Sequence, residues 1–135
     1  MATLNPYLNF ADGKAREAME LYRSVLGGEL NVMTFGDMGG EPAAGTMHAQ
    51  LETPAGFTLM ASDAPPGETI APGGSMHISL SGDDTDALTG WFRALADGGV
   101  VVDDLKQQVW GDTFGMLVDR FGIGWLVNIS GGGDA

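Results

Sequence analysis

Two stretches of sequence decide the fold, because each of them occurs twice. The letters YRSVLGG at 22–28 return as FRALADGG at 92–99, with one residue inserted. The letters LETPAGFTLM at 51–60 align with LVDRFGIGWL at 117–126. The first pattern is typical of a helix that ends at two glycines, and the second of two strands joined by a turn. Such a double repeat predicts two copies of one supersecondary unit.

The residues around the repeats predict the remaining elements of each half from hydrophobic spacing. In the first half we expect strands at 4–10, 30–35, 47–52 and 57–62 and a helix at 14–26. In the second half we expect strands at 76–80, 100–102, 113–118 and 125–129 and a helix at 85–96. Each half therefore has the order βαβββ.

This order predicts an α+β fold in one domain of 135 residues. Two βαβββ modules, about 4–63 and 75–130, would be joined by a Pro/Gly-rich linker at 64–74. We expect a curled mixed sheet around a cavity, with the helices on its outer face. The glycines at 131–133 are expected to form a disordered tail.

The composition indicates which partners are not expected and which cellular compartment is favoured. Eighteen acidic and six basic residues give a net charge of −12, so nucleic acid and membrane surfaces are not expected as partners. Cysteine is absent, which excludes disulfides and thiolate metal ligands and fits a reducing compartment. No signal peptide or long apolar run is recognisable in the sequence. We predict a cytoplasmic protein.

Alternation along the strands separates a helix-facing side from a helix-free side. The apolar set expected toward the helices is Met47, Ala49, Leu51, Phe57, Leu59, Ala61, Met76, Ile78, Leu80, Trp125, Val127 and Ile129. The set expected to line the ligand cavity is Tyr7, Asn9, His48, Gln50, Met60, Ser62, His77, Ser79, Trp110, Leu126 and Asn128. This mixture suits a small amphipathic ligand, but a solvated sheet face would show the same pattern.

Several motifs resemble one known group of proteins. They are PYLNF at 6–10, EA at 17–18 and LY at 21–22 ahead of the first glycine pair, LMASD at 59–63, WGDTFG at 110–115 and DRFG at 119–122 with Trp125. Together they resemble the PhnB-like branch of the vicinal oxygen chelate superfamily, which includes glyoxalase I, bleomycin-resistance proteins and extradiol dioxygenases. The resemblance runs from about Asn5 to Ile129 and implies the same fold of two βαβββ modules.

The resemblance also implies positions for a divalent metal, on the first and last strands of each module. Carried onto this chain, the last-strand positions fall at Met60 and Leu126, where carboxylates would be needed. The first-strand position of module one lies within Asn5–Tyr7, and His77 alone is a metal-ligand type. A first-row ion normally takes three or more protein ligands. We therefore predict no metal and no cofactor, and expect neither glyoxalase I nor dioxygenase activity.

Three hypotheses about function remain open. The first is a small-molecule-binding protein without the usual metal site. The alternative is an enzyme acting on a small metabolite through His48 and His77, as an acid–base pair or as part of a divalent metal site completed by Glu52 or Asp63. At a strand end, however, Asp63 is more often a turn-stabilising residue than a catalytic base. The third is a structural or regulatory dimer without a ligand.

A homodimer is predicted because short modules leave edge strands that a second copy can cover. Relatives in the superfamily commonly build cavities at or near a dimer interface, which implies the same assembly. Trp110, Phe114 and the linker are the expected apolar contributors. Trp110 could instead stack on a ligand or close the mouth of the cavity.

Overall fold

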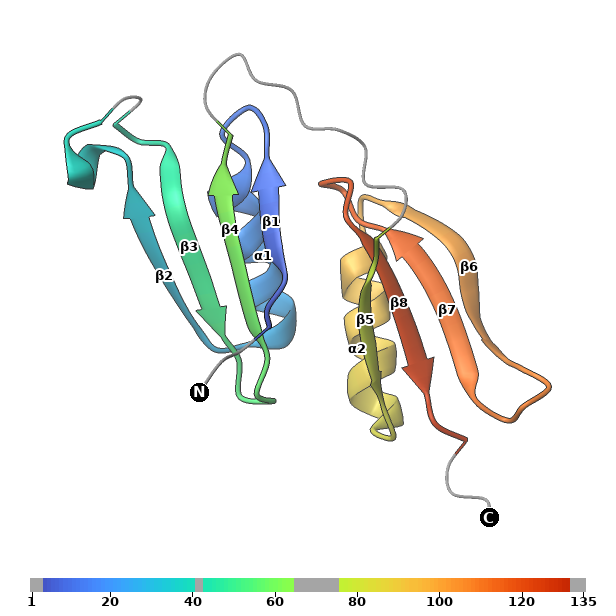
Figure 1. Ribbon diagram of the computed structural model, residues 1–135. Coiled ribbons are helices and arrows are strands. Elements are labelled where there is room, and N and C mark those ends of the chain that lie inside the picture. The colour runs from blue at the N-terminus through green and yellow to red at the C-terminus, as the bar shows by residue number, and fades with distance from the viewer. Residues whose placement is uncertain (1–3, 41–42, 65–75, 132–135) are drawn as a thin grey trace. The chain divides into compact units, whose positions relative to one another are not determined.

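The computed structural model describes residues 4–40, 43–64 and 76–131, and these fall into two compact units, Met1–Pro72 and Gly73–Ala135 (Figure 1). The first contains β1 (Tyr7–Phe10), α1 (Ala15–Leu26), β2 (Glu29–Thr34), a 3₁₀ turn η1 (Gly36–Met38), β3 (Thr46–Glu52) and β4 (Thr58–Asp63). The second contains β5 (Ile78–Gly82), α2 (Thr85–Ala96), β6 (Val100–Gln107), β7 (Thr113–Val118) and β8 (Gly124–Ile129). Most of the predicted linker and tail lie outside the described residues.

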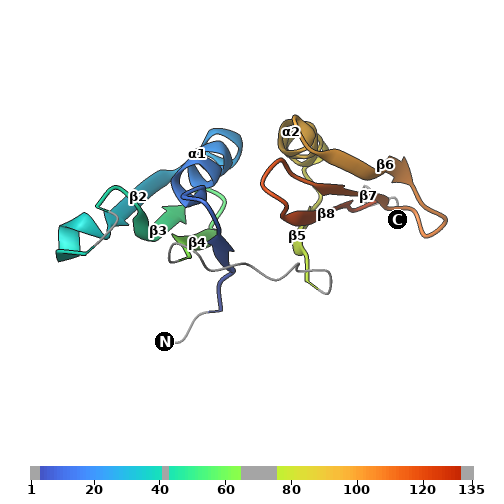
Figure 2. The ribbon, with the colours of Figure 1, turned by 90° about the horizontal axis from the view of Figure 1, so that it is seen from above.

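Each unit forms a mixed sheet of four strands with the same topology. The strand order is β1-β4-β3-β2 in the first and β5-β8-β7-β6 in the second. The first strand runs parallel to the last (β1 with β4, β5 with β8), and the remaining pairs are antiparallel. In each unit the helix lies along one face of its own sheet, as Figure 2 shows. The predicted α+β fold of two βαβββ modules is confirmed.

The core of each module lies between its helix and its sheet. In the first module the fully buried side chains include Met19 and Tyr22 of α1 and Leu51 of β3. In the second they include Phe92 of α2 and Trp125 of β8. Trp125, Val127 and Ile129 are buried toward the helix as the alternation predicted.

Three residues expected toward the helices lie outside the regular strand alternation. Met47 is only half-buried, because the register jumps from the Met33–His48 pair to the Thr34–Thr46 pair and leaves Met47 in a bulge. Phe57 precedes β4 and belongs to the turn before it. Met76 precedes β5 and its side chain is 77% exposed. Alternation held inside the regular strands and failed at their ends.

The strand predicted at 100–102 is the largest error in the element bounds, because β6 continues to Gln107. β6 is an edge strand that pairs only with β7, and nearly all its side chains are exposed. Its register with β7 is irregular on both sides of Asp103. An exposed, irregular edge strand needs no hydrophobic alternation, so the pattern stopped at Val102 although the backbone pairing did not.

The glycine pairs of the repeat end both helices against a strand of the same module. Gly27 and Gly98 have φ values of 78° and 80°, which favour glycine. The second glycine of each pair lies against backbone, so that a Cβ on Gly28 would overlap the carbonyl oxygen of Glu52, and one on Gly99 that of Val118. Close approach of helix end and strand end is therefore the physical reason for the repeated Gly-Gly.

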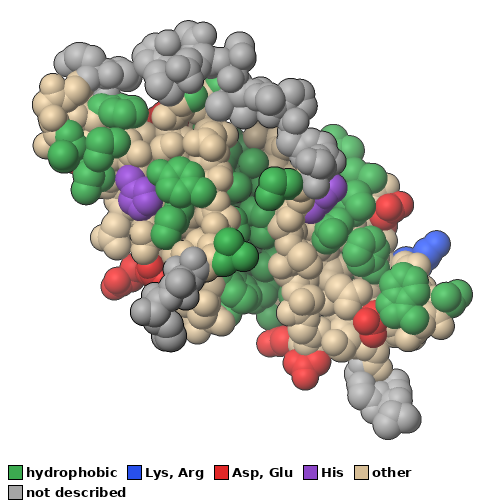
Figure 3. Space-filling view, in the orientation of Figure 1, with side chains coloured by type: hydrophobic (Ala, Val, Ile, Leu, Met, Phe, Trp, Pro, Cys, Tyr) green, Lys and Arg blue, Asp and Glu red, His purple; other side chains and the backbone are tan. Residues whose placement is uncertain are grey.

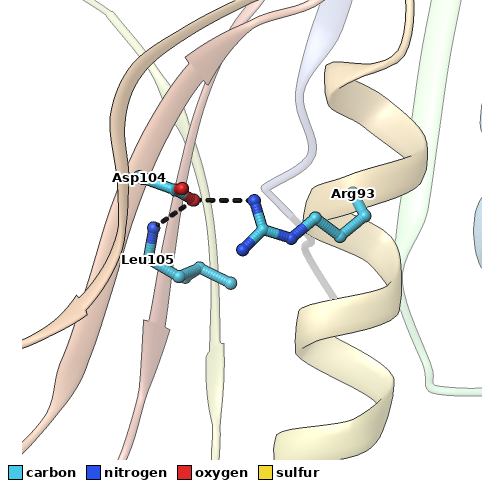
Figure 4. Close-up of polar contacts among 3 residues, drawn as sticks. All are labelled: Arg93, Asp104 and Leu105. Carbon is cyan, nitrogen blue, oxygen red and sulfur yellow. Dashed lines mark hydrogen bonds and ion pairs between the residues drawn. The ribbon is translucent and has the colours of Figure 1, made fainter.

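A polar contact ties α2 to the edge strand β6. An Arg93 guanidinium nitrogen donates to Asp104 Oδ1 at 2.7 Å, and the Leu105 backbone amide donates to the same oxygen at 2.8 Å (Figure 4). Both bonds favour the ionised carboxylate and hold the pKa of Asp104 below its ordinary value. The pair is exposed, so its role is to orient β6 rather than to supply much stability.

Among the described residues, neither helix is long and apolar enough to cross a membrane.

Candidate functional site

The helix-free face of the first module gathers six of the predicted cavity residues. Alternation along β1, β3 and β4 directs to this face Tyr7, Asn9, His48, Gln50, Met60 and Ser62. Met33 of β2 lies opposite His48 and joins them. Tyr7 and Met33 are 46% and 42% exposed, so solvent reaches this face. Figure 3 shows a histidine beside hydrophobic side chains on the strands of this module.

A chain of hydrogen bonds runs across this face from a phenol to a carboxylate. The Tyr7 hydroxyl lies 3.1 Å from His48 Nδ1, and the two ring centroids are 5.7 Å apart. His48 Nε2 lies 3.3 Å from Gln50 Oε1. Gln50 Nε2 donates to Glu52 Oε2, and the Thr58 hydroxyl donates to Glu52 Oε1 at 2.8 Å. We call Tyr7, His48, Gln50 and Glu52 the polar chain.

The partners of Glu52 fix the direction of every bond in the polar chain. Hydrogen bonds from Gln50 and then from Thr58 lower the pKa of Glu52, so its carboxylate is ionised and can only accept. The Gln50 amide must then turn its NH₂ to Glu52 and its oxygen to His48. His48 donates from Nε2–H, and in the neutral imidazole Nδ1 is left to accept the Tyr7 proton. The polar chain thus sets the tautomer of His48.

The surroundings of the polar chain are partly polar and partly apolar. On β1 and β4, the Ser62 hydroxyl donates to Asn9 Oδ1 at 3.3 Å. Met60 lies between Tyr7 and Gln50 in the strand register, and Met33 lies opposite His48. Two flexible thioethers therefore lie beside the phenol and imidazole, and such side chains adapt readily to an apolar ligand.

Asp63 does not belong to this face, and the prediction that it could complete a metal site with the histidines is wrong. Its side chain is buried with those of Leu59 and Ala61 on the helix side of β4. Its two oxygens accept the backbone amides of Ala15 and Thr46, both at 2.8 Å. Asp63 therefore caps the start of α1 from β4. The residue before the helix, Lys14, makes no side-chain capping bond, so Asp63 takes this role.

The second module carries the other predicted residues on or near its own helix-free face. Ser79 lies opposite Leu126 in the register, and Asn128 lies opposite Phe114. Asn128 is already engaged, because its amide donates to Asp112 Oδ2 at 3.0 Å. Bonds from Asn128, then the Gly131 backbone amide, and also Trp110 lower the pKa of Asp112.

His77 and Trp110 lie at the ends of strands in this module. His77 precedes β5 with its side chain exposed and its ring against Gly124. Trp110 lies in the turn between β6 and β7 and is 61% exposed. The structure therefore assigns His48 and His77 to different modules, and His48 alone has a described network of side-chain partners.

The donors at the implied metal positions do not fit a divalent ion. The register makes Ser79 the equivalent of Tyr7, because these residues lie opposite Leu126 and Met60 respectively. Taken at Tyr7 and Ser79, the four positions carry a phenol, a thioether, a hydroxyl and an aliphatic side chain. Taken at Asn5 and His77, they carry one imidazole, and neither set contains a carboxylate. Across the part of the chain that the structure describes, no group of three His, Asp or Glu side chains could hold a metal ion.

Sequence reasoning missed two parts of this site. Met33 was not assigned to a face, although its spacing from the β2 residues at 29 and 31 would have placed it there. The chain of hydrogen bonds from Tyr7 to Glu52 was also missed. Part of it could have been predicted, since residues 48, 50 and 52 alternate onto one face of the strand. The contribution of Tyr7 comes from a strand 41 residues away and needs the parallel β1–β4 pairing.

The chain consists of two βαβββ modules, and in each module the first strand runs parallel to the last. This is the fold that the resemblance to the vicinal oxygen chelate superfamily implies. The glyoxalase/bleomycin resistance protein/dioxygenase superfamily model matches residues 5–127. The chain belongs to this superfamily, which confirms the resemblance seen in the sequence.

Relatives of known sequence support the same assignment. Protein YjdN of Escherichia coli (strain K12) is 29% identical over 141 residues, covering 93% of this chain and 94% of that protein. The uncharacterized protein Rv0887c of Mycobacterium tuberculosis (strain H37Rv) is 33% identical over 130 residues, covering 90% of this chain and 71% of that protein.

Solved structures agree with the fold over nearly the whole chain. Protein PA1353 from Pseudomonas aeruginosa is 36% identical with a TM-score of 0.80, covering 95% of this chain and 98% of that one. A Bacillus cereus PhnB protein, described as a putative 3-demethylubiquinone-9 3-methyltransferase, is 24% identical with a TM-score of 0.73. That comparison covers 96% of this chain and 100% of the other, and at this identity it shows the fold alone.

Proposed function

We propose that the protein binds a small amphipathic molecule on the helix-free face of its first module, without a metal ion. The observation that carries this proposal is the Tyr7–His48 pair, which is ordered by Gln50 and Glu52 yet remains open to solvent through Tyr7. An exposed polar group usually hydrogen-bonds to water and moves freely. Here four side chains are aligned across two strands, as a binding site requires.

The charge and the neighbouring side chains restrict the ligand. Glu52 and, opposite it on β2, Glu29 are the charged side chains on the strands of this face, and the whole chain carries −12. An anion would be repelled, and the apolar side chains of Met33 and Met60 favour a neutral ligand over a strongly hydrated cation. Met33 and Met60 offer apolar contact for a ring or short chain, while the Tyr7 oxygen offers a hydrogen-bond acceptor. A small molecule with one aromatic or apolar part and one hydroxyl fits this combination.

Methyl resonances of labelled methionine would test where such a molecule binds. On titration with small neutral aromatic ethers, beginning with 4-nitroanisole, we expect the Met33 and Met60 signals to shift and saturate. The signal of Met19, which is fully buried behind the sheet, should stay in place. Met33→Leu and Met60→Leu would assign the two signals. Prior dialysis against EDTA should leave the affinity unchanged; loss of binding on chelation, or shifts confined to other methionines, would contradict the proposal.

We also propose that the protein is a homodimer, since each sheet presents unpaired edge strands. In the second module the edge strand β6 carries Val100, Val101 and Val102, which are 63%, 41% and 51% exposed. Exposed apolar edge strands are commonly covered by a partner.

Light scattering at micromolar concentration is expected to give twice the 14.0 kDa chain mass. Val100→Lys should weaken association if β6 is covered by the second copy. Ser24→Lys, an exposed change on α1, should have no effect. A wild-type mass of one chain would refute the dimer.

A further inference from the structure

The polar chain leaves one strong acceptor exposed, and this determines what it can recognise. Tyr7 donates its single hydroxyl proton to His48 Nδ1, so the lone pairs of its phenolic oxygen remain for a ligand. With the residue 46% exposed, a ligand can approach this oxygen from solvent. The complementary ligand group is therefore a hydroxyl that donates a hydrogen bond.

The same arrangement can accept a proton. If the ligand hydroxyl passes its proton to Tyr7 Oη while Tyr7 passes its own to Nδ1, His48 becomes an imidazolium with both nitrogens protonated. The new charge is already accommodated, because Nε2–H has Gln50 Oε1 as its acceptor and Gln50 is held by the Glu52 carboxylate. Glu29, opposite Glu52 on β2, adds a second negative charge on the strands of this face.

Building on the proposed function, we infer that the site takes up an acidic hydroxyl compound, a phenol or an enol, and holds it as its anion through a Tyr7–His48 proton relay. The O–H bond of the ligand breaks, the Nδ1–H bond of His48 forms, and Tyr7 is regenerated as a neutral phenol. The ligand approaches as a neutral molecule, so the acidic surface does not repel it. The total charge of the complex equals that of its separate components.

The probe pair 4-nitrophenol and 4-nitroanisole separates this inference from binding itself. Only the first can ionise, and its phenolate absorbs at a longer wavelength than the neutral phenol. At a pH below the pKa of the free phenol, we expect the bound probe to show the phenolate band. The ratio of phenolate to phenol should be at least about tenfold higher than in free solution, as charge-assisted hydrogen bonds would produce.

The chain offers matched controls, because it has two tyrosines and two histidines. Tyr7→Phe and His48→Gln should abolish the phenolate band, measured at saturating 4-nitrophenol as judged from the Met33 and Met60 methyl signals. Tyr22→Phe, in the core behind the sheet, and His77→Gln, in the other module, should leave the band in place.

Gln50 and Glu52 act as positioning residues, and the same spectrum tests them. Gln50→Met keeps the length of the side chain but disconnects His48 from the carboxylate. It should lower the phenolate-to-phenol ratio of the bound probe severalfold, measured at saturating 4-nitrophenol.

The outcomes distinguish failure of the proton relay from failure of the proposed binding function. If 4-nitrophenol binds but stays neutral, or only 4-nitroanisole binds, the proton relay is overturned and the proposed function stands. If neither probe binds, both are overturned. A phenolate band that survives in Tyr7→Phe and His48→Gln overturns the assignment of the relay to these residues.

Discussion

Gly28→Ala is expected to lower the free energy of unfolding by about 3 kcal/mol. Gly28 has a φ of 106°, which a residue with a Cβ adopts only under strain, and the added carbon would overlap the Glu52 carbonyl oxygen. The obstacle is backbone rather than a flexible side chain, so the end of α1 and the end of β3 would have to separate. Urea unfolding followed by circular dichroism would measure the change.

The second glycine pair allows another test of whether close approach between helix end and strand end requires glycine. A glycine inside α2 serves as the control. Gly99→Ala should destabilise by a similar mechanism, because its Cβ would overlap the Val118 carbonyl oxygen. Gly90 lies within α2, where a Cβ added to it would meet nothing within 4 Å. Gly90→Ala should therefore raise stability by about 0.5–1 kcal/mol. Equal tolerance of alanine at all three sites would show that close approach does not explain the glycine pairs.

Asp63→Ala is expected to cost about 3 kcal/mol of unfolding free energy. The change removes the acceptor of two backbone amides, Ala15 N–H at the start of α1 and Thr46 N–H at the start of β3. Ala15 and Thr46 are themselves almost fully buried, so water cannot readily replace the carboxylate. The effect would be read from the shift of the denaturation midpoint together with loss of helical signal.

Asp84→Ala provides the comparison, because the second module caps its helix in the ordinary local way. Asp84 accepts the Ala87 amide at 3.0 Å in an exposed position, and removing such a cap costs about 1 kcal/mol. A larger loss at Asp84 than at Asp63 would contradict the assignment of Asp63 as a buried anchor between helix and strand.

Asp119 belongs to the DRFG motif on which the family resemblance partly rests, and its contacts give it a structural role. Its side chain is buried and accepts the amides of Phe121 and Ile123 and the indole N–H of Trp125, the last at 2.9 Å. These bonds form the turn between β7 and β8 and hold the largest core side chain of the module. The corresponding turn of the first module uses the Thr53 hydroxyl, which accepts the Phe57 amide. The bonds that Asp119 accepts give this residue of the DRFG motif a role in folding.

The sequence by itself determined the βαβββ order, the ends of α2, and the face occupied by most strand residues. Helical and strand periodicities are local properties, and the glycine pairs mark where each helix ends. Six cavity residues of the first module were predicted on one face because alternation is regular within β1 and β4 and from His48 onward in β3. The same rule failed at Met47, where a bulge interrupts the period, and along β6, where exposure removes the pattern.

Tertiary structure alone decided which residues meet. Asp63 and His48 lie on neighbouring strands of one sheet, yet one is buried against α1 and the other belongs to the opposite face. Tyr7 reaches His48 only because β1 pairs in parallel with β4, which places β1 two strands from β3. Strand order and register depend on contacts between distant segments, so the polar chain became visible only in the folded sheet.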